Sequence, residues 1–114
     1  MNNIQKGRLG EKIAVNYLID NDASILETNY RIKSGEIDII AKLNEELVFI
    51  EVKSRSSIKF GYPSEAVNYN KKRKIINTAK YFMLKNNLND ITIRFDVIEI
   101  YLKENKINHI LNAF

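Results

Sequence analysis

The sequence predicts an α/β domain in which two long helices flank a mixed β-sheet of about five strands. Two segments carry apolar residues at helical spacing, and five shorter segments carry the alternating or continuous apolar runs typical of strands. The chain has 114 residues, which is the size of one domain with one ordinary hydrophobic core. We therefore expect residues 1–114 to form a single domain.

The two helices are predicted from their apolar stripes. Residues Lys6–Ile19 carry apolar side chains at intervals of three and four residues. The second helix is expected to begin at Ser64, whose hydroxyl is suited to cap a helix N-terminus, and to run to about Asn86. Its core stripe is expected to consist of Ile75, Ile76, Ala79, Phe82 and Met83.

The expected strands are Ser24–Tyr30, Glu36–Lys42, Leu47–Lys53, Ile91–Leu102 and Ile107–Leu111. In the fourth strand, alternation places Ile93 and Phe95 on an apolar face and Arg94 and Asp96 on a polar face. The single histidine, His109, is expected to lie at the surface, away from the acidic residues discussed below.

The most informative segment is residues 35–53, GEIDIIAKLNEELVFIEVK, which is predicted to form a β-hairpin. A turn centred on Asn44 and Glu45 pairs residues whose numbers sum to 89. This register pairs apolar residues, namely Ile37 with Val52, Ile39 with Ile50, Ala41 with Val48, and Ile40 with Phe49. It also places Asp38 opposite Glu51, and Glu36 opposite Lys53.

Two carboxylates therefore face each other at one end of an otherwise apolar hairpin. Directly opposed residues have Cβ atoms about 4.5–5.5 Å apart, and like charges there are destabilising. Asp38 and Glu51 need a cation, a shared proton or open water, and Lys53 emerges about 6.6 Å further along the same face. A divalent metal held by the two acids meets this need. A solvated edge on which Lys53 merely neutralises Glu36 meets it as well.

The composition restricts which metal and which compartment are expected. The chain has no cysteine and one histidine, which excludes disulfides, thiolate zinc sites and histidine metal clusters. Any metal must bind through oxygen ligands, which favours Mg²⁺ or Mn²⁺. No apolar run approaches the length of a membrane span, and the N-terminus lacks the pattern of a secretory signal. We therefore expect a cytoplasmic protein with no membrane association.

The net charge is +4, and the basic residues cluster in the middle of the chain. Lys71 and Lys72 belong to the dense run 71–74, which suits either a phosphate-bearing partner or a solvated helix face. Arg55 and Lys59 lie in a polar loop suited to phosphate contacts. In the same loop Tyr62 suits either stacking on an unpaired base or pinning of the loop.

The spacing of the acids carries a family resemblance. Asp38, twelve residues, and then Glu51-Val52-Lys53 resembles the D-x(n)-E-x-K signature of the PD-(D/E)xK, or restriction-endonuclease-like, nucleases. The run GEIDIIA…LVFIEVKSR…FGYPSEAV more closely resembles the small YraN family of bacterial proteins. The resemblance extends from residue 7 to residue 97 and implies a restriction-endonuclease-like core. The chain has Ile37 where the superfamily name has proline.

The resemblance also implies an activity: metal-dependent phosphodiester cleavage of DNA, possibly branched or otherwise structured. By this resemblance Asp38 and Glu51 hold Mg²⁺ or Mn²⁺, Lys53 assists the attack of water, and Glu36 tunes Lys53. Glu11 matches the acid that a first helix often adds to the metal site, although an ordinary exposed glutamate fits its position too.

The partner follows from the same resemblance, with DNA the first expectation and RNA the other. The nucleic-acid contacts are expected from Arg55, Lys59, Tyr62, Lys71 and Lys72, and family members carry a lysine near Lys71. Small nucleases of this kind often cut duplex DNA as dimers, so a homodimer is one expectation. Two alternatives stay open: a nucleic-acid-binding or accessory module with little cleavage activity, and a purely structural interaction protein.

Overall fold

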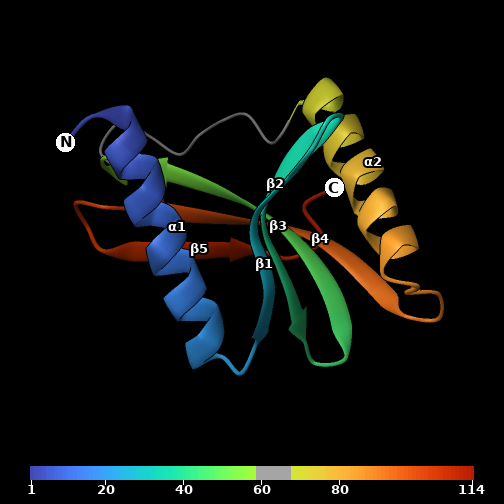
Figure 1. Ribbon diagram of the computed structural model, residues 1–114. Coiled ribbons are helices and arrows are strands. Elements are labelled where there is room, and N and C mark those ends of the chain that lie inside the picture. The colour runs from blue at the N-terminus through green and yellow to red at the C-terminus, as the bar shows by residue number, and fades with distance from the viewer. Residues whose placement is uncertain (59–67) are drawn as a thin grey trace.

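The computed structural model describes residues 1–58 and 68–114 (Figure 1). In chain order the elements are α1 (Asn3–Asp20), β1 (Ser24–Ile32), β2 (Gly35–Leu43), β3 (Glu46–Arg55), α2 (Tyr69–Lys85), β4 (Thr92–Tyr101) and β5 (Lys106–Ile110). The predicted α/β class, with five strands and two helices, is confirmed. No helix within the described residues is long and apolar enough to cross a membrane.

The five strands form one sheet in the order β1-β2-β3-β4-β5. β3 and β4 are parallel, whereas the other neighbouring pairs are antiparallel, so the sheet is mixed as expected. Figure 1 shows α1 and α2 on opposite sides of the sheet. The architecture is therefore the predicted α/β arrangement, a mixed sheet with a helix on each side.

Each helix covers its own half of the hydrophobic core. On the α2 side, Phe49 packs with Phe82, and on the α1 side the next residue, Ile50, packs with Leu18. All four side chains are 5% exposed or less. The central strand β3 is thus buried on both faces, which explains its continuous apolar run.

The hairpin register is confirmed over most of its length. The pairs run from Ile39–Ile50 to Leu43–Glu46, and the residue numbers of each pair sum to 89. Asn44 and Glu45 have φ values of 50° and 69°, the left-handed conformation that a two-residue hairpin turn requires. The local turn signal therefore fixed the pairing of the two central strands.

Beyond Ile39 the predicted pairing is wrong. Ile37 packs on the α2 side, whereas Ile39 packs on the α1 side, so the strand does not alternate regularly across Asp38. Asp38 Oδ2 instead accepts a hydrogen bond from the backbone N–H of Val52 at 2.7 Å. A side chain thus takes the place of a backbone partner. The predicted pairs Ile37–Val52, Asp38–Glu51 and Glu36–Lys53 are absent from the β2–β3 ladder of the described chain.

The helix starts also differ from expectation, because both helices begin at asparagine caps. Asn2 and Gln5 form a capping box, so α1 begins at Asn3 rather than Lys6. In α2, Asn68 Oδ1 accepts the backbone N–H of Lys71 at 2.9 Å, and the helix begins at Tyr69. Within the described residues α2 thus has its N-cap at Asn68, and the expected N-cap Ser64 lies outside the described residues.

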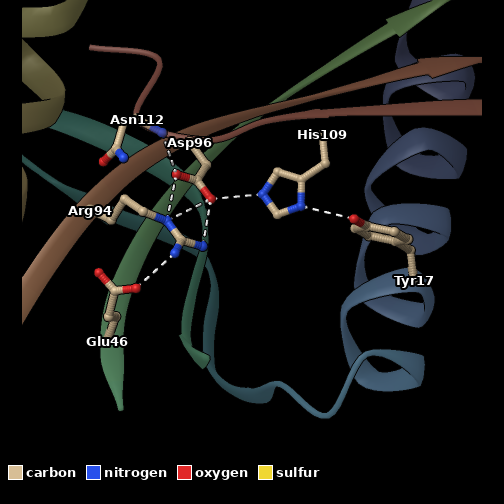
Figure 2. A network of polar contacts seen from close by, with 6 residues as sticks. All are labelled: Tyr17, Glu46, Arg94, Asp96, His109 and Asn112. Atoms are coloured by element: carbon tan, nitrogen blue, oxygen red, sulfur yellow. Dashed lines mark hydrogen bonds and ion pairs between the residues drawn. The ribbon is translucent and has the colours of Figure 1, made fainter. Parts of the chain in front are cut away.

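Arg94 and Asp96, on the predicted polar face of β4, are buried, and Figure 2 shows the polar contacts that they make. Asp96 is 0% exposed and Arg94 is 9% exposed. The Arg94 Nε donates to Asp96 Oδ1 at 2.9 Å, and its Nη1 donates to Glu46 Oε1 at 2.9 Å. A buried charge requires such pairing, and the pattern of one strand could not reveal the partners.

The expectation that His109 lies at the surface is also wrong. Its side chain is 10% exposed; Nε2 lies 2.7 Å from Asp96 Oδ2, and Nδ1 lies 2.9 Å from the Tyr17 hydroxyl (Figure 2). Burial raises the pKa of Asp96, but the hydrogen bonds from His109, Arg94 and the Asn112 amide outweigh it, and the net pKa is lowered. The carboxylate accepts hydrogen bonds, so Nε2 carries the proton. This chain of contacts ties β4 and β5 to α1.

Candidate functional site

The candidate site lies where β2 and β3 separate, and α1 reaches it through a close approach at Gly10. A Cβ at Gly10 would overlap Ser54 Oγ and lie 2.9 Å from the Ser54 Cβ. Only a glycine lets the helix backbone approach β3 this closely. The next residue, Glu11, is thereby held against the strand that carries Glu51.

On the other side, α2 approaches β2 at Gly35. A Cβ there would lie 2.7 Å from Thr78 Oγ1 and 3.1 Å from the Lys74 carbonyl oxygen. Thr78 is completely buried and donates its hydroxyl to that same carbonyl at 2.7 Å, so neither atom is free to move away. Two glycines therefore set the positions of the two helices beside the site.

Asp38 and Glu51 are brought together as the sequence predicts, although not through a ladder pair. Burial, followed by a hydrogen bond with the Glu51 carboxyl and its charge, raises the pKa of Asp38 to about 8. The Val52 amide opposes this by stabilising the carboxylate, and the charge of Glu11 adds to it. Glu51 is 8% exposed. Partly buried Asp38 and buried Glu51 thus form a pair that can share one proton.

Glu11 contributes a third acid to the same region. Its Oε1 is buried and has no hydrogen-bond partner. Burial, and then the charges of Glu36 and Glu51, raise the pKa of Glu11. A buried oxygen without a donor is costly, so Glu11 is not an ordinary exposed glutamate.

The acids border a hollow of about 440 Å³. Its lining residues are Asn3, Lys6, Gly7, Glu11, Asp38, Glu51, Val52, Ser54 and Arg55. Within residues 1–58 and 68–114, no three His, Cys, Asp or Glu side chains converge as a metal-binding group. The carboxyl pair alone fits a hard divalent cation, which would take its remaining ligands from backbone carbonyls, water or substrate.

Lys53 and Glu36 lie near this pair but do not contact each other. Lys53 is partly exposed, and its side chain makes no ion pair or hydrogen bond with the part of the chain that the structure describes. Glu36 Oε2 accepts hydrogen bonds from Arg31 Nη2 at 2.8 Å and Nε at 3.2 Å. The predicted partnership of Glu36 with Lys53 is therefore not formed, because Arg31 takes the carboxylate.

The predicted nucleic-acid contacts divide into three groups. Arg55 lines the acid hollow, and Lys71 Nζ lies 3.3 Å from Glu51 Oε2. Lys72 Nζ lies 5.9 Å from the centre of the ring of Phe114, the last residue of the sequence, in a cation–π contact. The remaining two, Lys59 and Tyr62, lie outside the described residues.

Two cations at this site were missed by the sequence reasoning. Lys6 lines the acid hollow, and Arg8 lines a neighbouring hollow of about 590 Å³ together with Asn29 and Arg31. The spacing of Arg8 and Glu11 could have indicated that Arg8 lies near the site, because residues three apart are neighbours on a helix surface.

Comparison with known proteins agrees with the resemblance. The model of the "Uncharacterised protein family UPF0102" matches residues 10–100. A UPF0102 protein of Clostridioides difficile (strain 630) is 64% identical over 114 residues, covering 100% of both chains. A UPF0102 protein of Caldanaerobacter subterraneus subsp. tengcongensis is 47% identical over 95% of this chain and 93% of its own length.

Among solved structures, SfsA of Pyrococcus furiosus in complex with Ca²⁺ aligns with a TM-score of 0.33 and 16% identity. The alignment covers 95% of this chain and 62% of SfsA. From the family match and the two bacterial relatives, the chain belongs to UPF0102, the YraN family.

Proposed function

We propose that this protein is a metal-dependent phosphodiesterase that cleaves DNA, with branched or otherwise structured DNA as its substrate. The observation that carries the proposal is the pairing of partly buried Asp38 with buried Glu51, beside a hollow that Lys6 and Arg55 also line. Glu51 is too buried for the pair to be a solvated edge. A doubly charged cation relieves the repulsion between the two carboxylates and leaves both ionised.

Asp38 and Glu51 would hold Mg²⁺ or Mn²⁺, and Glu11 would add negative charge to the hollow that all three residues line. When bound, the ion would lower the pKa of a coordinated water and neutralise negative charge on the substrate phosphate. The Val52 N–H fixes one oxygen of Asp38, so the carboxyl group keeps its orientation toward Glu51. This orientation is a prerequisite for holding one ion between two strands.

Lys53 would act on the substrate directly. Its ammonium group has no partner among the described side chains, and it follows Glu51 by two residues on the same face of β3. It is therefore free to donate hydrogen bonds to a phosphate oxygen or to the attacking water. Arg55 would bind an adjacent phosphate from the rim of the acid hollow.

The test is cleavage of branched and linear DNA with Mg²⁺ or Mn²⁺. We expect Asp38→Asn, Glu51→Gln and Lys53→Ala each to lower the rate by about a hundredfold or more. Lys85→Ala removes an exposed lysine in the last turn of α2 and is expected to leave the rate unchanged. Equal residual activity in the wild type and in Lys53→Ala would remove this mechanism.

One observation favours a second function, a nucleic-acid-binding module with little or no cleavage activity. In the described residues, three acidic side chains do not converge into a preformed metal-binding group. Such a module would bind DNA in the presence of EDTA, lose affinity steeply with salt and be unaffected by Asp38→Asn. DNA binding that requires a divalent ion and Asp38 would exclude it.

A further inference from the structure

Lys71, in the first turn of α2, contacts one of the two acids of the site directly. Its Nζ lies 3.3 Å from Glu51 Oε2; the lysine side chain is 48% exposed and the glutamate side chain 9% exposed. Building on the function proposed above, we propose that Lys71 couples metal binding to DNA binding. It opposes the metal at Glu51 until a phosphate of the substrate draws it away.

The opposition follows from charge and from shared atoms. Glu51 is buried, and the ammonium group of Lys71 lies within ion-pair distance of its Oε2. A divalent ion binding to Glu51 must share this carboxylate with the ammonium group and is repelled by it. Lys71 therefore lowers the affinity of the acid pair for a cation.

The release is possible because only the base of Lys71 is fixed. Its backbone N–H is held by Asn68 Oδ1 at 2.9 Å, which places Cα firmly at the start of α2. The half-exposed side chain also lines a hollow of about 380 Å³ on the α2 side, with Asn70 and Lys74. A phosphate entering this hollow can take the ammonium group from Glu51, since phosphate competes well for lysine.

The two events must then be linked in both directions. When phosphate holds Lys71, the metal meets a less hindered Glu51 and binds more tightly; when metal holds Glu51, Lys71 is released to the phosphate. Lys71 is in this sense a positioning residue that acts through Glu51. It makes the loaded site more stable where substrate is present than where it is absent.

The first experiment is calorimetric titration with Mn²⁺ alone, comparing the wild type with Lys71→Ala. We expect roughly three- to tenfold tighter binding in the variant, because a half-exposed pair is screened but the ion carries two charges. Lys85→Ala removes a lysine about 21 Å further along the same helix and should leave the affinity unchanged. A merely structural role for Lys71 would give the opposite sign, since a disordered site binds metal less well.

The second experiment adds a short DNA duplex with non-hydrolysable linkages. In the wild type the DNA should tighten Mn²⁺ binding; in Lys71→Ala this gain should be lost, and in Lys71→Arg it should be retained. If Mn²⁺ binds through Asp38 and Glu51 but Lys71→Ala leaves its affinity unchanged or weaker, the coupling is overturned and the proposed function stands. If Mn²⁺ fails to bind, or binds independently of Asp38, both the coupling and the proposed function are overturned.

Discussion

The carboxylate of Asp38 accepts the backbone N–H of Val52 at 2.7 Å, across the point where β2 and β3 separate. Below this contact, from Glu46 to Ile50, β3 pairs with both β2 and β4. Above it, from Glu51 to Arg55, β3 pairs with β4 alone. The hydrogen bond therefore does two things. It closes the open end of the hairpin, and it holds an acid beside Glu51 at a depth where its charge is unfavourable.

This burial predicts a pH dependence of stability. The folded pKa of Asp38 is raised to about 8, whereas an unfolded aspartate titrates near about 3.9. Between these two pH values the folded state binds more protons than the unfolded state. The contribution of Asp38 to the free energy of unfolding therefore falls as the pH rises from about 4 to about 8. Urea unfolding of the wild type and Asp38→Asn at pH 6 and pH 9 measures this. The wild type should lose more stability than the variant, and an equal loss would contradict the assignment.

Metal affinity should change with pH in the opposite direction. A divalent ion binds the ionised pair, so it must displace the proton that burial and Glu51 retain on Asp38. Mn²⁺ affinity is expected to rise from pH 6 to about pH 8 and then level off. Glu51→Gln should lower the affinity at every pH, while Asp90→Asn, an exposed aspartate before β4, serves as the control. Affinity that is independent of pH would show that Asp38 is not a ligand.

The features that could be predicted from sequence are local ones. The turn at Asn44-Glu45 and the alternation beside it fixed the hairpin register, and with it the proximity of Asp38 and Glu51. The irregularity at Asp38 could not be predicted, because it depends on a side chain replacing a backbone acceptor. Regular alternation carries no signal for such a replacement.

The buried polar network was missed for a different reason. Tyr17 and His109 are 92 residues apart, and His109 and Asp96 are 13 apart on neighbouring strands. The alternation of β4 marks Asp96 as polar and therefore as outward-facing. Only the placement of α1 over that face makes it a buried position, and no local pattern specifies which face a distant helix covers.

The network should nevertheless dominate the stability of the β4–β5 end. Asp96→Asn removes the charge that Arg94 and His109 share, which leaves a buried guanidinium with Glu46 as its remaining acid. We expect a loss of about 3 kcal/mol in urea unfolding at pH 7. Asp90→Asn, an exposed change of the same kind, should alter stability little.

The pH profile of this variant provides an independent check. The folded pKa of Asp96 is lowered, so the contribution of Asp96 to stability is present above its unfolded pKa. That contribution is lost as the pH falls through the folded pKa. The difference between the wild type and Asp96→Asn should therefore shrink as the pH falls below about 4. A difference that stays constant down to pH 2 would mean that the charge of Asp96 is not what stabilises this end.

The approach of α1 to β3 can be tested with two glycines of the same helix. A Cβ at Gly10 overlaps Ser54 Oγ, whereas a Cβ at Gly7 meets nothing within 4 Å. We expect Gly10→Ala to displace Glu11 from the acid hollow, lowering stability by about 1–3 kcal/mol and Mn²⁺ affinity with it. Gly7→Ala should instead raise stability by up to about 1 kcal/mol, because alanine favours the helix.

Ser54→Ala removes the overlapping Oγ and should recover part of the loss in the double variant with Gly10→Ala, since the Ser54 Cβ still lies 2.9 Å away. If Gly10→Ala behaved like Gly7→Ala, the close contact would not be what places α1 at the site.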